Sequence, residues 1–125
     1  MTDVSIVVPA YNEADSLPLL VERLRPILEA EVATWEVIVV DDGSVDQSRL
    51  VLRELHNRDR RIKAICLSRN FGKERAIMAG LQRARGNAVV LMDADLQHPP
   101  ETIPRFLEKW REGYSVVFGT RKTRD

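Results

Sequence analysis

Two aspartates separated by one residue stand out in the 125-residue sequence, at Asp93 and Asp95. They follow Ala88–Met92, an apolar run with the length of a buried strand. In extended chain, residues i and i+2 point the same way, so both carboxylates can face one site, and Gln97 continues the alternation with a neutral oxygen. Hard oxygen ligands suit Mg²⁺ or Mn²⁺, and such an ion can bridge a diphosphate and stabilise it as a leaving group. The alternative is an acidic strand end followed by a turn.

Two other loops carry polar residues after predicted strands. Asp41–Ser44 (DDGS) offers carboxylates that can accept hydrogen bonds from a base N–H or from ribose hydroxyls. Pro9–Glu13 (PAYNE) supplies an aromatic surface, an amide and a carboxylate around a rigid turn. Each loop taken alone is explained equally well as an ordinary turn, because Asp, Asn, Gly, Ser and Pro all favour turns.

Two residues of other types are weaker candidates. Lys73 follows a glycine, but this is not a P-loop, because that motif needs an earlier Gly where Leu67 stands and Ser or Thr where Glu74 stands. A lysine at the start of a helix can still contact a phosphate, and the alternative is a solvated side chain. Cys66 lies within a predicted strand and is expected to be part of the core.

The elements that must position these loops alternate between strand and helix. The predicted strands are apolar, largely β-branched runs: Val4–Val8, Trp35–Val40, Ile62–Leu67, Ala88–Met92 and Ser115–Gly119. The predicted helices begin at Asp15 or Ser16, Asp46, Gly72 and Pro99, and they extend to about Leu28, His56, Arg85 and Trp110. Pro26 is expected to kink the first helix or end it early, and Gly86 to cap the C-terminus of the third.

This alternation predicts an α/β fold with a doubly wound, mostly parallel sheet and helices on both faces. Ligands of such sheets bind outside the carboxyl ends of the strands, at the point where the strand order reverses. Three of the predicted loops bring carboxylates to that edge, where neighbouring strands lie only about 4.8 Å apart. Their mutual repulsion indicates that a cation or the donors of a ligand compensate them.

Composition narrows the class of protein. The length predicts a single domain over residues 1–125, and 19 basic against 19 acidic side chains argue against a nucleic-acid binder. One Cys cannot form an internal disulfide, and one Cys with two His is too few for a structural zinc site. The sequence shows neither a signal peptide nor an apolar run of about 18 residues, so a soluble, cytoplasmic chain is expected. Because the chain stops soon after its last predicted strand, we expect a portion of a longer protein.

Taken together, the motifs resemble those of a known family. Val7–Glu13, Asp41–Ser44 and Asp93–Gln97, in this order and spacing, are similar to a family 2 glycosyltransferase with the GT-A fold. Leu67–Lys73 and Asp95–Glu101 further resemble the polyprenyl-phosphate branch, which includes dolichyl-phosphate mannose synthases and undecaprenyl-phosphate sugar transferases. The resemblance covers essentially the whole chain.

The resemblance implies a metal-dependent, inverting hexosyltransferase that moves a sugar from a UDP- or GDP-sugar to a polyprenyl phosphate at the cytoplasmic face of the cell membrane. It implies Asp93 and Asp95 as catalytic residues, the same two with Gln97 as ligands of Mg²⁺ or Mn²⁺, and Arg121 near the acceptor phosphate. The residues that it implies for nucleotide-sugar binding are Pro9, Ala10, Tyr11, Asn12, Glu13, Asp41, Asp42, Lys73, Asp93 and Ala94.

Members of this family are longer and continue into acceptor-binding and membrane segments. The resemblance therefore implies that this chain alone does not transfer sugar and that it meets the membrane surface through further segments. The end after the predicted fifth strand leaves a sheet edge or an apolar face uncovered, which favours homo-oligomers. Two alternatives stay open: a family 2 enzyme acting on a saccharide hydroxyl, which would need a general base, and a non-catalytic nucleotide-binding module. A receiver-type signalling domain is disfavoured, because the first strand ends in PAYNE and the third in SRNFG.

Overall fold

A computed structural model describes residues 2–96 and 99–113 and contains a parallel sheet. Its strands are β1 (Thr2–Ala10), β2 (Trp35–Asp41), β3 (Ile62–Cys66) and β4 (Gly86–Leu91), in the spatial order β3-β2-β1-β4. The register aligns Ile6 with Val37 on one side of β1 and with Val90 on the other. The predicted parallel sheet is thus confirmed, while the predicted fifth strand, Gln97 and Arg121 lie outside the described residues.

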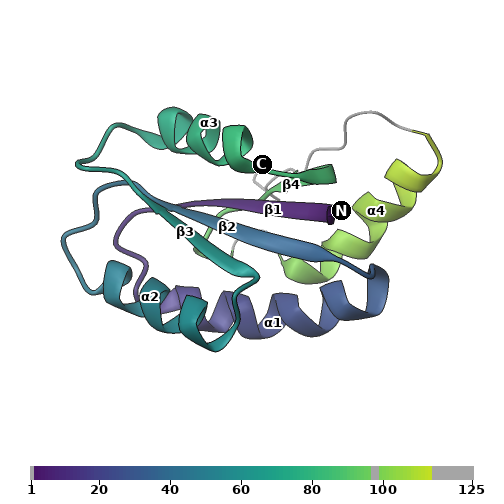
Figure 1. Cartoon of the computed structure of the whole chain (residues 1–125), viewed down its shortest axis with the longest axis horizontal. Helices are drawn as coiled ribbons and strands as arrows, with labels where there is room; N and C mark the ends of the chain where they lie inside the picture. The colour runs from purple at the N-terminus through teal and green to yellow at the C-terminus, as the bar shows by residue number, and fades with distance from the viewer. Residues whose placement is uncertain (1, 97–98, 114–125) are drawn as a thin grey trace, which may run out of the picture.

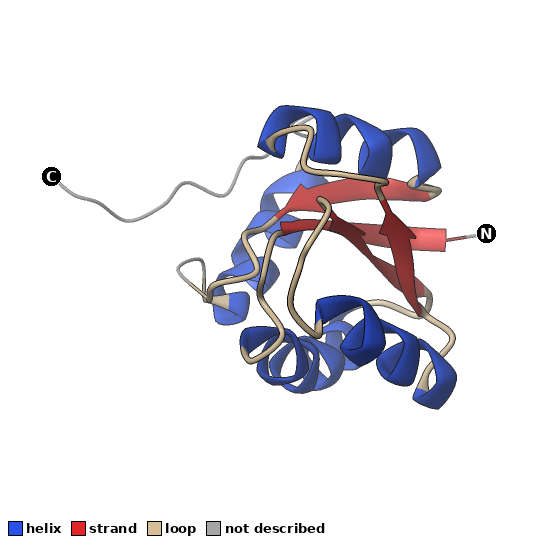
Figure 2. Ribbon diagram, turned by 90° about the vertical axis from the view of Figure 1, so that its left-hand side faces the viewer, coloured by secondary structure: helices blue, strands red, loops and turns tan. Residues whose placement is uncertain are grey.

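Helices cover both faces of this sheet, as the sequence predicted (Figures 1 and 2). α3 (Lys73–Arg83) packs alone on one face, whereas α1 (Ser16–Glu31), α2 (Ser48–Arg58) and α4 (Ile103–Arg111) pack on the other. A short 3₁₀ turn, η1 (Pro100–Thr102), leads into α4. The fold is therefore doubly wound, with crossovers from β1 to β2 and β3 on one side and a return to β4 on the other.

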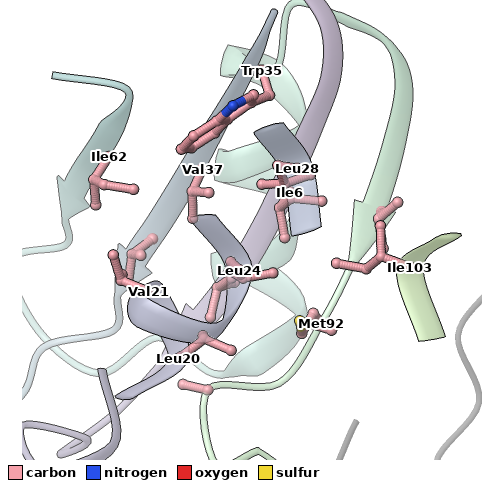
Figure 3. Close-up of a cluster of buried hydrophobic side chains, with 14 of the residues drawn as sticks. Ile6, Leu20, Val21, Leu24, Leu28, Trp35, Val37, Ile62, Met92 and Ile103 are labelled. Atoms are coloured by element: carbon pink, nitrogen blue, oxygen red, sulfur yellow. The ribbon is translucent and has the colours of Figure 1, made fainter. Parts of the chain in front are cut away.

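The larger core lies between the sheet and the three-helix layer (Figure 3). Leu17, Leu20, Leu24 and Leu28 recur every three or four residues along α1, and all four are buried. They meet the inward side chains of the strands, which alternate with period two because successive strand residues point to opposite faces. On the other face the packing is closer: a Cβ on Gly80 of α3 would lie 2.5 Å from Cγ1 of Val7. This close approach explains a glycine in the middle of that helix.

Two local expectations were wrong, for Gly86 and Cys66, and one of the two outcomes expected for Pro26 does not occur. Pro26 does not end α1, which continues to Glu31 because Pro26 is on the exposed face, while the buried leucines on either side hold the helix on the core. Gly86 does not cap α3 but opens β4, where a Cβ would lie 2.5 Å from the backbone nitrogen of Ser5. Cys66 is exposed rather than part of the core, because it ends β3, which is the outermost strand of the described sheet.

Asp59 joins the turn before β3 to α1. Its carboxylate accepts hydrogen bonds from the backbone N–H and Nε of Arg61, both at 3.0 Å, and from Nε of Arg25 at 3.2 Å. The Arg61 guanidinium also stacks 4.1 Å from the centroid of the Trp35 ring. The hydrogen bonds from Arg61, opposed in part by burial, lower the pKa of Asp59 to about 2.

This shift predicts a loss of stability in acid. A lowered pKa stabilises the folded state at pH values above the ordinary Asp range, and the contribution disappears as pH falls from about 4 towards 2. We expect Asp59→Asn to reduce the free energy of unfolding at pH 6 by about 1–2 kcal/mol, and to reduce it much less at pH 2.5. Urea unfolding at both pH values measures this. An equal loss at both would show that the charge of Asp59 does not contribute.

Candidate functional site

A cavity of about 180 Å³ opens at the carboxyl edge of the sheet. β1 lies between β2 and β4 there, so the cavity is at the point where the strand order reverses. Every residue that lines it belongs to the set predicted from the sequence: Pro9, Ala10, Tyr11, Glu13, Asp42, Lys73, Asp93, Ala94 and Asp95. The remaining predicted residues that the structure describes, Asn12 and Asp41, contact the surrounding loops instead.

Asp93 and Asp95 reach the cavity by a different route from the one expected. β4 ends at Leu91, and the chain turns at residues 94 and 95, so the two aspartates are not consecutive positions of an extended strand. Ala94 between them is 2% exposed and belongs to the larger core. Leu96 then has a φ of 67°, in the left-handed region. The buried alanine anchors the turn, which leaves the flanking carboxylates on the cavity side.

Lys73 is the cationic residue of the cavity lining. It is the first residue of α3, and its Nζ lies 2.7 Å from Oδ1 of Asp93. The ammonium side chain is 57% exposed and that of Asp93 is 14% exposed. The Lys73 side chain is thus largely in solvent and also pairs with a carboxylate of the candidate metal motif, so a contact with phosphate stays a prediction.

Asp42 holds the loop that precedes Lys73. Its Oδ1 accepts a hydrogen bond from the Phe71 N–H at 2.8 Å, and its Oδ2 accepts one from the Gly72 N–H at 3.1 Å. The Asn70 side-chain amide donates to the Asp42 backbone carbonyl at 3.2 Å. Asp42 is 4% exposed, so these contacts fix a buried carboxylate and the start of α3 together. The role of residues 70–72 was missed, because no sequence spacing shows which loop a carboxylate contacts.

Asp41 points into its own loop. Its Oδ2 accepts hydrogen bonds from the Ser44 N–H at 3.2 Å and from Nε of Arg49 at 3.0 Å, and its Oδ1 accepts one from the Ser44 hydroxyl. Arg49 also donates to the backbone carbonyl of Leu67. Asp41 is fully buried and joins the ends of β2 and β3 through Arg49. Arg49 was not singled out from the sequence, where it reads as an exposed helix residue.

Asn12 connects the loop after β1 to the loop after β2 through hydrogen bonds. It has a φ of 55°, in the left-handed region that Asn tolerates better than most residues. Its Oδ1 accepts hydrogen bonds from the N–H groups of Val45 at 2.9 Å and Asp46 at 3.3 Å, and its own N–H donates to the Ser44 hydroxyl at 2.8 Å. Asn12 therefore shapes the cavity rim through the backbone and does not line the cavity.

The cavity is strongly acidic. Four carboxylate residues line it, Glu13, Asp42, Asp93 and Asp95, against the single ammonium group of Lys73. Within residues 2–96 and 99–113, no group of three or more His, Cys, Asp or Glu side chains is arranged to hold a metal ion. Two carboxylates on one turn nevertheless fit Mg²⁺ or Mn²⁺ that takes its remaining ligands from water and phosphate, which is the usual arrangement for nucleotide-bound Mg²⁺.

Comparison with known proteins agrees with this fold and site. The model of glycosyl transferase family 2 matches residues 5–125, and the chain belongs to this family. The chain is 47% identical over 123 residues to the undecaprenyl-phosphate 4-deoxy-4-formamido-L-arabinose transferase of Pectobacterium carotovorum. The match covers 98% of this chain and 38% of that relative. The chain thus spans well under half the length of such a relative.

Solved structures show the same fold, which is the GT-A fold of glycosyltransferases. Glucosyl-3-phosphoglycerate synthase of Mycobacterium tuberculosis superposes with a TM-score of 0.71 at 23% identity, over 90% of this chain and 40% of that one. A mannosyltransferase of Pyrobaculum calidifontis, solved in complex with GDP-Man and Mn²⁺, superposes with a TM-score of 0.64 at 30% identity. That match covers 84% of this chain and 31% of the mannosyltransferase.

None of the helices in the described part of the chain is both long enough and apolar enough to cross a membrane.

Proposed function

We propose that this chain is the donor-binding part of a glycosyltransferase that moves a sugar from a nucleoside-diphosphate sugar to a polyprenyl phosphate. The observation that carries the proposal is the cavity at the reversal point of the strand order, where the loops after β1, β2 and β4 and the start of α3 meet. Nucleotides bind at this position in doubly wound sheets.

The donor is proposed to lie across the cavity with its diphosphate towards Asp93 and Asp95. A divalent cation held by these carboxylates, with Gln97 as a further ligand, would neutralise charge on the diphosphate as the sugar leaves. The Lys73 ammonium, 2.7 Å from Oδ1 of Asp93, is proposed to supply a second positive charge to the diphosphate. The Tyr11 ring, which is 44% exposed, is proposed as a wall of the nucleoside pocket, and Asp42 as its polar end.

Several features support polyprenyl phosphate as the acceptor. The relative from Pectobacterium carotovorum is named an undecaprenyl-phosphate transferase, at 47% identity. A phosphate monoester has a second pKa of about 6, so it is largely ionised at neutral pH and needs little help from a general base. Arg121 is proposed to contact this phosphate. The sugar would be transferred with inversion, at the membrane surface, with parts of a longer protein supplying the acceptor side.

A transfer assay tests the part of this proposal that makes the chain the donor-binding part alone. The chain is incubated with Mn²⁺, undecaprenyl phosphate in detergent and radiolabelled UDP- or GDP-sugars, and lipid-linked label is counted. We expect the donor to bind but no label to be transferred. Donor and acceptor would not be held together by this chain alone, and such positioning supplies roughly 7–11 kcal/mol of barrier reduction. Robust transfer would show that the acceptor side lies within these 125 residues.

A further inference from the structure

The contact between Lys73 and Asp93 has a consequence for how a cation enters the site. Asp93 is one of only two carboxylates on the turn that is proposed to hold the metal, and the Lys73 ammonium lies 2.7 Å from its Oδ1. An ammonium and a divalent cation on the same carboxylate would repel each other strongly at such short separation. Lys73 and the metal therefore compete for Asp93.

The Lys73 side chain can move away from Asp93 while its backbone stays in place. Its side chain is more than half exposed, so its flexible four-carbon stem can turn without disturbing buried packing. Its backbone, in contrast, is held in place, because Asp42 accepts hydrogen bonds from the N–H groups of the two preceding residues. The ammonium group can thus move over a short arc above the cavity while the start of α3 stays fixed.

We propose that Lys73 is an exchangeable cation of this site: it neutralises Asp93 in the nucleotide-free chain, and it moves to the nucleoside diphosphate when a divalent cation takes its place. This inference rests on the proposed function, because it needs a diphosphate and a metal in the cavity. It follows that the metal and the nucleotide bind as a linked pair, each raising the affinity of the other by the same factor. Among the described residues, no three His, Cys, Asp or Glu side chains are arranged to hold a metal ion, which points the same way, since the metal then needs phosphate oxygens.

Binding measurements on Lys73→Met test the linkage. The affinity for Mn²⁺ alone is measured from the electron paramagnetic resonance signal of the free ion, and the affinities for UDP and GDP, with and without Mn²⁺, by titration calorimetry. The matched control is Arg75→Met, which removes the same charge from an exposed position of α3 that does not line the cavity. Lys73→Gln is a second variant, and thermal unfolding checks that all three variants are folded.

We expect Lys73→Met and Lys73→Gln to bind Mn²⁺ alone about two- to tenfold more tightly than the wild type, because the competing ion pair is gone. We expect their affinity for the nucleotide with Mn²⁺ to fall about tenfold, because a charge-assisted contact to phosphate is lost. Arg75→Met should match the wild type in its affinity for Mn²⁺ alone and in its affinity for the nucleotide with Mn²⁺. Unchanged or weaker Mn²⁺ binding in the Lys73 variants, or unchanged nucleotide binding, would overturn this inference but not the proposed function. A wild-type chain that binds neither Mn²⁺ nor nucleotide would overturn the proposed function with it.

Discussion

Asp95→Asn is expected to abolish the dependence of nucleotide binding on Mn²⁺ while leaving the fold intact. Asp95 lines the cavity from the turn after β4, beside Ala94, which anchors that turn in the core. Asn keeps the shape of the side chain but removes the negative charge that a hard divalent cation needs. We expect the affinity for UDP or GDP in the presence of Mn²⁺ to fall about 10- to 100-fold, which titration calorimetry measures directly.

Asp15→Asn is the matched control for this experiment. Asp15 is an exposed residue just before α1, and its substitution makes the same change in net charge outside the cavity lining. Nucleotide affinity should be unchanged in this variant. If Asp95→Asn kept the full stimulation by Mn²⁺, the metal would be held elsewhere and the assignment of the cavity would be wrong.

Glu36→Ala is expected to have the largest effect on stability. Glu36 is 2% exposed on the α3 face of β2 and connects all four strands. Its Oε2 accepts hydrogen bonds from the Ser5 hydroxyl at 2.6 Å and from the Arg85 N–H at 2.8 Å, and its Oε1 lies 2.8 Å from Nζ of Lys63. The Gly86 N–H donates to the same Ser5 hydroxyl. Burial by itself raises the pKa of Glu36, but the hydrogen bonds from Lys63, Ser5 and Arg85 lower it on balance.

Removal of this carboxylate leaves the buried Ser5 hydroxyl and the part-buried Arg85 N–H without their acceptor. We expect the free energy of unfolding to fall by about 2–4 kcal/mol, measured by urea unfolding at neutral pH. Glu29→Ala is the control, because the Glu29 side chain is 49% exposed and its ion pair with Arg61 should contribute less than about 1 kcal/mol. Equal losses in the two variants would contradict a structural role for the Glu36 network.

Much of the fold follows from local patterns in the sequence. The runs Val4–Val8 and Trp35–Val40 are continuous and apolar because both faces of β1 and β2 are covered. The leucines of α1 recur with helical spacing because one side of that helix meets the sheet. Where strands and helices alternate, right-handed crossovers make the strands parallel. Ligands of such sheets bind at the carboxyl ends of the strands, so the edge of the sheet that holds the cavity also follows. This is why the residues that line the cavity were predictable.

Contacts between segments that are distant in sequence could not be predicted. Asp41 and Asp42 are equivalent in a sequence pattern, yet Asp42 lines the cavity and Asp41 binds Arg49. Which one faces the cavity depends on the pleat at the end of β2 and on the approach of Arg69 and Asn70, whose backbone packs against Gly43. The same limit applies to Gly86, where a Cβ would clash with the backbone of Ser5 on β1, so a larger residue does not fit. Local propensity carries no information about these neighbours.

The central claim is that the acidic cavity at the carboxyl edge of the sheet is a metal-dependent nucleoside-diphosphate site. Titration calorimetry of the chain with UDP and with GDP, each in Mn²⁺ and in excess chelator, tests it most directly. The claim predicts measurable binding of at least one nucleotide with Mn²⁺, weakened at least about tenfold when the metal is removed. Binding that is equally strong in chelator, or no binding of either nucleotide under any condition, would contradict it.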